Sequence, residues 1–120
     1  MNAFIKLGVI EPLAQALYQQ GIRFPTAIQQ ASIPAIFKGK DIIGHSETGT
    51  GKTLAYLLPL VQRVDVKKGG TQVLIMTPTR ELAKQIFDVL RPFAILMEAD
   101  VAEIIGGRTL ENQIQKLKRE

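Results

Sequence analysis

The eight residues 46–53 read SETGTGKT and combine three features that can hold a phosphate chain. Gly49 and Gly51 let the backbone turn tightly, so that several N–H groups face one concavity. Lys52 supplies a cation that can reach the β- and γ-phosphates of a nucleotide, and Thr53 supplies a hydroxyl that can bind Mg²⁺. The residues that follow are apolar at helical spacing, so a helix N-terminus would add its partial positive charge. The run predicts a phosphate-binding loop with Thr53 as a metal ligand.

Two residues of this loop depart from an ideal phosphate site. Ser46 stands where the strict pattern has glycine, but this position needs only a small residue at the end of a strand. Glu47 would repel a triphosphate, so its side chain is expected to point away from the phosphates. The alternative is a flexible glycine loop that binds nothing, and the flanking strand and helix favour phosphate binding. The loop is completed by Thr48 and Thr50.

The spacing of apolar residues and breakers predicts alternating strands and helices around this loop. Helices are expected at 12–20, 27–37, 52–64, 79–90 and 109–118, and buried strands at 41–44, 72–76 and 101–105. Gly21 and Gly39 should end the first two helices, whereas Pro34 should kink or split its helix and Pro92 should interrupt its own. Strands that alternate with helices pair in parallel through right-handed crossovers, so the predicted fold class is α/β.

The amino-acid composition limits which classes of function are possible. The chain has 120 residues, enough for one domain or part of one, and 46% of them are hydrophobic. It lacks cysteine and has a single histidine, His45, which excludes disulfides and multi-histidine metal sites. No apolar run approaches a membrane span and no signal peptide is recognisable, so the expected location is cytoplasmic. A net charge of +4 leans slightly toward anionic partners, although solubility alone explains it as well.

Four motifs, taken together, resemble those of DEAD-box RNA helicases in order and spacing. Residues 24–29 (FPTAIQ), preceded by Gly21, resemble the Q motif, and 46–53 resembles motif I. Residues 78–83 (PTRELA) match motif Ia, and Gly106-Gly107 matches a glycine doublet after the third strand. The resemblance implies a partial RecA-like phosphate-loop domain over residues 1–120, with a Q-motif region at 1–30.

The same resemblance implies how ATP is bound. Gln29 would pair its amide with adenine N6 and N7, because that amide offers both a donor and an acceptor. Thr26 would cap its own helix and brace the phosphate loop. Phe4, 17 residues before Gly21, would pack on the adenine side, and Phe24 would contribute apolar surface where the family often has a polar side chain. Without the resemblance, Gln29 reads as an exposed helix residue and Phe4 as a hydrophobic staple on the first predicted helix.

Motif Ia and the glycine doublet imply contacts with the RNA backbone. The first-turn amides after Pro78 and Thr79 can hold a phosphate, and Arg80 can add charge. Gly106 and Gly107 permit close approach of another backbone, although alone they read as a plain turn. Contacts of this kind do not depend on base sequence.

The function implied by the resemblance is ATP-dependent RNA unwinding, with Lys52 and Thr53 in the catalytic site and ATP and Mg²⁺ as cofactors. The Asp-Glu-Ala-Asp motif and the second RecA-like domain do not occur within 120 residues, and the last predicted helix has no cap. We therefore expect a truncated amino-terminal fragment that is inactive alone. In the family the strand before the phosphate loop pairs with later strands, so the fragment should be marginal, rearranged or completed by a partner, including a second copy.

Two other functions compete with this one. A nucleotide- or RNA-binding module without catalysis is favoured by the missing acidic motif. A small kinase would also use a phosphate loop, but it has no need for the Gln29 region or for the run at 78–83.

Overall fold

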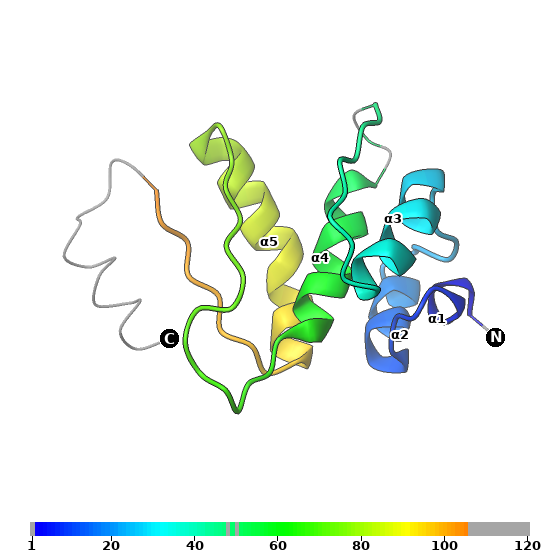
Figure 1. Cartoon of the computed structure of the whole chain (residues 1–120), viewed down its shortest axis with the longest axis horizontal. Coiled ribbons are helices and arrows are strands. Elements are labelled where there is room, and N and C mark those ends of the chain that lie inside the picture. Colours follow the sequence, from blue (N-terminus) through cyan, green and yellow to red (C-terminus); the bar gives the residue numbers. More distant parts are fainter. Residues whose placement is uncertain (1, 48, 50, 106–120) are drawn as a thin grey trace. The chain divides into compact units, whose positions relative to one another are not determined.

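The structure is a computed structural model that describes residues 2–47, 49 and 51–105 (Figure 1). The described residues form α1 (Ala3–Lys6), α2 (Glu11–Gln19), α3 (Ala27–Phe37), α4 (Lys52–Arg63) and α5 (Arg80–Leu96). The chain divides into two compact units, Met1–Arg63 with the first four helices and Val64–Glu120 with α5. None of the helices in the described part is long and apolar enough to cross a membrane.

Local sequence sets the ends of the helices in the first unit. Gly21 ends α2 with a φ of 83°, a left-handed conformation that glycine adopts without strain. Thr26 begins α3 with a capping box in which Gln29 is the reciprocal partner. Gly39 follows α3 with a φ of 79°, and its N–H donates to the Ile36 carbonyl at 2.9 Å. The helices predicted at 12–20, 27–37 and 52–64 are thereby confirmed.

Two prolines lie inside helices, and neither of them ends its helix. Pro34 lies within α3, which is not split, and Pro92 lies within α5, which runs on to Leu96 instead of ending near residue 90. A proline removes the hydrogen bond to the carbonyl four residues earlier. The residue four positions before Pro34 is Gln30, and the residue four positions before Pro92 is Asp88. Both are exposed, so water can form a hydrogen bond with each of their carbonyls.

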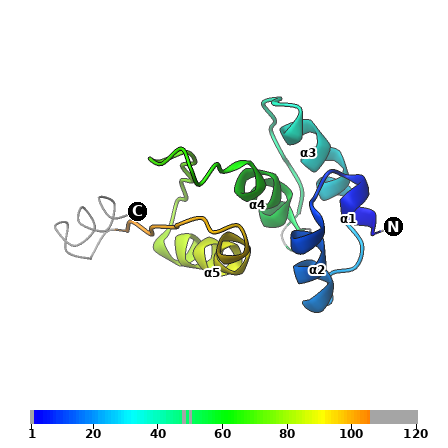
Figure 2. The same ribbon diagram turned by 90° about the horizontal axis from the view of Figure 1, so that it is seen from below.

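Packing in the first unit brings α4 against α3, and α1 against α2 (Figures 1 and 2). Two side chains at the end of α4 also bond to the backbone of the preceding elements. Gln62 donates from Nε2 to the Gly8 carbonyl and accepts from the Ile10 N–H, each at 3.0 Å. Arg63 Nη1 donates to the Ile36 carbonyl at 3.1 Å, at the carboxyl end of α3. The helix that starts at the phosphate loop is therefore tied at its far end to the amino-terminal helices.

The core of the first unit draws on all four of its helices. Its buried apolar side chains are Phe4, Val9, Leu13, Ala14, Leu17, Ile33, Ile36, Ala55, Leu57, Leu58 and Val61. In the second unit, α5 begins at Thr79, whose side chain accepts from the Leu82 N–H at 3.1 Å. It contributes Ile86, Phe93 and Ala94 as its buried residues.

No strand is present among the described residues, so the parallel sheet predicted at 41–44, 72–76 and 101–105 is not confirmed. Ile43 is fully exposed, and Leu74 and Met76 are 79% and 84% exposed, whereas the sequence predicts all three in the core. A strand exists only where its backbone groups pair with a neighbour. These segments find no such neighbour in the described part of the chain. The helix predicted at 109–118 lies outside the described residues.

Candidate nucleotide-binding site

The phosphate-loop residues lie at the start of α4. Lys52 is the first residue of the helix, and its Nζ donates to the Ser46 carbonyl at 2.6 Å. Gly49 and Gly51 have φ values of 82° and 87°, in the left-handed region that the prediction of a tight loop required. Glu47 is exposed. The Lys52 side chain is thus bonded to the backbone of the loop itself. Thr48 and Thr50 lie outside the described residues.

Gly51 is the point at which the loop meets α3. A Cβ on Gly51 would overlap the Gln29 side-chain amide and lie 3.1 Å from Thr26 Oγ1. The space that a side chain would need is therefore already occupied by the two polar residues of the predicted Q motif. Glycine is required here both for its φ and for this close approach.

Gln29 is buried, with 2% of its surface exposed, which excludes the interpretation as an exposed helix residue. Its Oε1 accepts from the Thr26 N–H at 2.9 Å, and its Nε2 donates to the Gly51 carbonyl at 3.1 Å. The Thr26 hydroxyl accepts from the Gln29 N–H at 3.4 Å and so completes the capping box. One amide hydrogen and one lone pair of Gln29 remain beyond these bonds. The pairing of Gln29 with adenine stays a prediction.

The two phenylalanines assigned to the site have opposite surroundings. Phe4 lies in α1, which sequence reasoning did not identify, and its ring is completely buried. Phe24 is 79% exposed and precedes the capping box by two residues. Next to it, the Arg23 guanidinium lies 4.9 Å from the centroid of the Tyr18 ring. The burial of Phe4 makes it part of the core, and both the staple on the helix at 12–20 and the contact with a base stay predictions.

Thr53, the expected Mg²⁺ ligand, has a neighbour that sequence reasoning missed. Burial raises the pKa of the Tyr56 hydroxyl above 10.0, and a side-chain hydrogen bond with Thr53 opposes this rise. Residues three apart on a helix lie on the same face. The three-residue separation of Thr53 and Tyr56 could therefore have indicated this contact from the sequence. Gln62 was missed as well, and nothing local to it indicates its bonds to residues 8 and 10.

The residues predicted to contact RNA lie in the second unit. Thr79 caps α5, Thr77 Oγ1 donates to the Thr79 carbonyl at 2.8 Å, and Arg80 is the exposed first residue of the helix. The capped amino end of a 17-residue helix is therefore present where motif Ia predicts it. Pro78 is exposed just before it. Gly106 and Gly107 lie outside the described residues.

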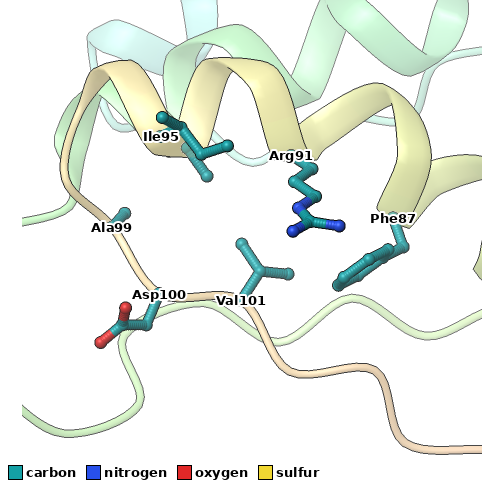
Figure 3. Close-up of a pocket in the computed structure, with 7 residues that line it drawn as sticks. Phe87, Arg91, Ile95, Ala99, Asp100 and Val101 are labelled. Carbon is teal, nitrogen blue, oxygen red and sulfur yellow. The ribbon is translucent and has the colours of Figure 1, made fainter.

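A hollow of about 310 Å³ also lies in the second unit, between one face of α5 and the segment that follows it (Figure 3). Its lining residues are Phe87, Arg91, Ala94, Ile95, Ala99, Asp100 and Val101. None of the predicted site residues is among them. Within residues 2–47, 49 and 51–105 there is also no group of three or more His, Cys, Asp or Glu residues that could hold a metal ion.

The chain is similar to helicases over nearly all of its length. A family model described as DEAD/DEAH box helicase matches residues 26–120. RNA helicase CrhR of Synechocystis sp. is 41% identical over 118 residues, which are 98% of this chain and 24% of that relative.

Solved structures agree with this similarity. A DEAD box protein from Methanococcus jannaschii has a TM-score of 0.86 at 31% identity, over 96% of this chain and 32% of that one. RNA-helicase Prp28 from Chaetomium thermophilum bound to ADP has a TM-score of 0.83 at 38% identity, over 98% and 30%. The chain thus spans 24–32% of the length of these relatives, whose matching domains are RecA-like. It belongs to the DEAD/DEAH box helicase family.

Proposed function

We propose that this chain is the nucleotide-binding part of an ATP-dependent RNA helicase. The observation that carries the proposal is the bond from Gln29 Nε2 to the Gly51 carbonyl, at 3.1 Å. It joins the residue expected to read adenine to the loop expected to hold the phosphates. A phosphate loop of another nucleotide-binding class has no need for a buried glutamine at this place.

In this proposal the nucleotide spans two sets of residues in the first unit. Residues 46–53 surround the phosphates, with Lys52 leaving the Ser46 carbonyl to contact the β- and γ-phosphates. The positive φ of Gly49 and Gly51 supports an inward-facing row of N–H groups. Thr53, in the first turn of α4, would provide one hydroxyl ligand to Mg²⁺, which neutralises developing charge on the phosphates when bound. Thr26 and Gln29 would hold the adenine end.

RNA would contact the second unit through its backbone. The amino end of α5 carries the partial positive charge of a helix, and Arg80 adds a full charge there. Pro78 and Thr79 set the direction in which the chain enters this helix. Gly106 and Gly107 complete the proposed contact set. S. cerevisiae Dbp5 bound to RNA and ADP BeF3, with a TM-score of 0.79, shares the fold at 22% identity.

The domain itself is proposed to be incomplete over residues 1–120. The exposed Ile43, Leu74 and Met76 support pairing of their segments in a parallel RecA-like sheet with further strands of the same protein. An acidic motif for Mg²⁺ and a second RecA-like domain would complete the catalytic site. Expressed alone, the chain would have little or no turnover, and its exposed apolar segments would favour self-association.

The test is ATP hydrolysis by the full-length protein, with and without single-stranded RNA. Lys52→Ala should abolish RNA-stimulated hydrolysis, whereas Lys67→Ala, in an exposed turn of the second unit, should retain it. Hydrolysis that survives Lys52→Ala would contradict the site assignment. Nucleotide binding that requires Lys52, in a full-length protein that never hydrolyses ATP, would instead favour the non-catalytic module.

A further inference from the structure

The hollow beside α5 has one wall that comes from a single face of this helix. Phe87, Arg91 and Ile95 follow one another at intervals of four residues, so their side chains are neighbours along that face (Figure 3). Ile95 is 64% exposed, whereas Phe93 and Ala94, next to it in the sequence, are buried. The face therefore presents two apolar side chains with a guanidinium between them.

The opposite wall forms where the chain turns back at the end of α5. Glu98 has a φ of 57°, and its N–H donates to the Ile95 carbonyl at 3.1 Å. The Ala99 N–H donates to the Ala94 carbonyl at 2.9 Å, so the helix ends in a Schellman motif. This turn directs residues 99–101 back along the helix, where they line the second side of the hollow (Figure 3). Both walls thus belong to the second unit and are joined by a hydrogen-bonded turn.

The hollow combines an unpaired cation with apolar surface. Arg91 forms no hydrogen bond or ion pair with another residue in the described part of the chain, and its guanidinium points into the hollow. The Asp100 carboxylate points away from Arg91 (Figure 3). The planar set of N–H donors on Arg91 is therefore available to a ligand, and its geometry matches a carboxylate. Phe87, Ile95 and Val101 supply the apolar surface beside it.

The size and charge of the hollow limit the class of ligand. Its volume of about 310 Å³ is near the lower end of the range found for small-molecule sites. A single guanidinium, with the carboxylate of Asp100 on the opposite wall, favours an anion with one charge over a multiply charged phosphate. An apolar body on that anion would replace water on Phe87 and Ile95, which is favourable.

We propose that this hollow binds a small organic monocarboxylate. The carboxylate pairs with the Arg91 guanidinium, and the apolar body packs on Phe87, Ile95 and Val101. The residues that form this site are not those of the proposed nucleotide site, so the proposal stands independently of the helicase function.

The test is a ligand-observed NMR titration of the full-length protein with two matched probes. One is 3-phenylpropionate, an apolar monocarboxylate, and the other is 3-phenylpropionamide, which has nearly the same shape and no charge. Wild type should bind the acid at least about tenfold more tightly than the amide, because a hydrogen bond to a charged group is stronger than one between neutral groups.

Two pairs of variants assign the binding to this hollow. Arg91→Gln should weaken binding of the acid about five- to twentyfold and leave binding of the amide within about threefold. Lys84→Gln is its control, because it removes an exposed cation of α5 that does not line the hollow. Ile95→Ala should weaken binding of both probes about three- to tenfold through loss of apolar contact. Leu96→Ala, an exposed position of α5 outside the hollow, should leave both affinities within about twofold.

Four outcomes would overturn the proposal. Absence of acid binding by wild type would remove the site, and equal affinity for acid and amide would remove the pairing with Arg91. An equal loss of acid binding in Arg91→Gln and Lys84→Gln would show a general effect of charge. Displacement of the acid by an equal concentration of inorganic phosphate would contradict the choice of a carboxylate. Thermal unfolding of Arg91→Gln should match wild type, because an exposed side chain contributes little to stability.

Discussion

Gln29 and Gly51, 22 residues apart in the sequence, are joined by a hydrogen bond of 3.1 Å from a buried side-chain amide to a backbone carbonyl. The same amide accepts from the Thr26 N–H at 2.9 Å, so the cap of α3 and the loop before α4 share one side chain. Any movement of the loop that displaces the Gly51 carbonyl must therefore change the surroundings of Gln29. This contact makes the loop sensitive to substitutions that are distant in sequence.

Gly51→Ala should destabilise the protein more than a comparable change elsewhere. Alanine at a φ of 87° costs about 1–2 kcal/mol, and its Cβ would also displace the Gln29 amide, which adds about 1–3 kcal/mol. Gly21→Ala is the matched control, since its φ is 83° and a Cβ there would have no heavy atom within 4 Å. Urea unfolding of both variants measures the difference. Equal destabilisation by Gly51→Ala and Gly21→Ala would show that the contact with Gln29 contributes nothing to the free energy of unfolding.

Gln62→Ala should lower the unfolding free energy by about 1–2 kcal/mol, because two hydrogen bonds to the backbone are lost. Gln62→Glu provides a sharper test. Its carboxylate can still accept from the Ile10 N–H but cannot donate to the Gly8 carbonyl. Hydrogen exchange should therefore show the Ile10 amide protected in Gln62→Glu and unprotected in Gln62→Ala. Equal exchange in the two variants would contradict the two-bond arrangement.

Tyr56 should make stability depend on alkaline pH. Its pKa is raised above 10.0 by burial, so the folded protein keeps the phenol proton to a higher pH than the unfolded chain does. The contribution is fully present below pH 10 and is lost as pH rises from there through the folded pKa. Tyr56→Phe should have a flatter decline of unfolding free energy above pH 10 than wild type. Parallel curves for the two proteins would argue against the raised pKa.

Ile43→Thr tests whether its segment becomes a buried strand in a completed domain. In the 120-residue chain the side chain is fully exposed, so the unfolding free energy should change by less than about 0.5 kcal/mol. In the full-length protein a buried strand would make the same change cost about 1.5–3 kcal/mol. Ile33→Thr, at a position with 0% exposure, should be costly in both. An equally small effect of Ile43→Thr in both proteins would count against the parallel sheet.

The sequence by itself determined the elements whose signals are local. Gly21 and Gly39 end their helices because glycine accepts positive φ, and the Thr26–Gln29 capping box begins α3 through bonds three residues apart. The phosphate loop was predictable for the same reason. The prediction that Pro92 interrupts its helix was wrong. The energetic cost of a proline in a helix depends on whether the carbonyl that loses its hydrogen bond can reach water, and the spacing of residues in the sequence does not reveal this.

Only the tertiary structure decided which side chains are buried and which residues meet across the chain. Phe4 and Phe24 are the same residue type, yet one is fully buried and the other is open to solvent. The bonds of Gln29 to Gly51 and of Gln62 to Gly8 join residues 22 and 54 positions apart. Strand pairing is equally non-local. Such contacts follow from how helices pack, and no local propensity encodes them.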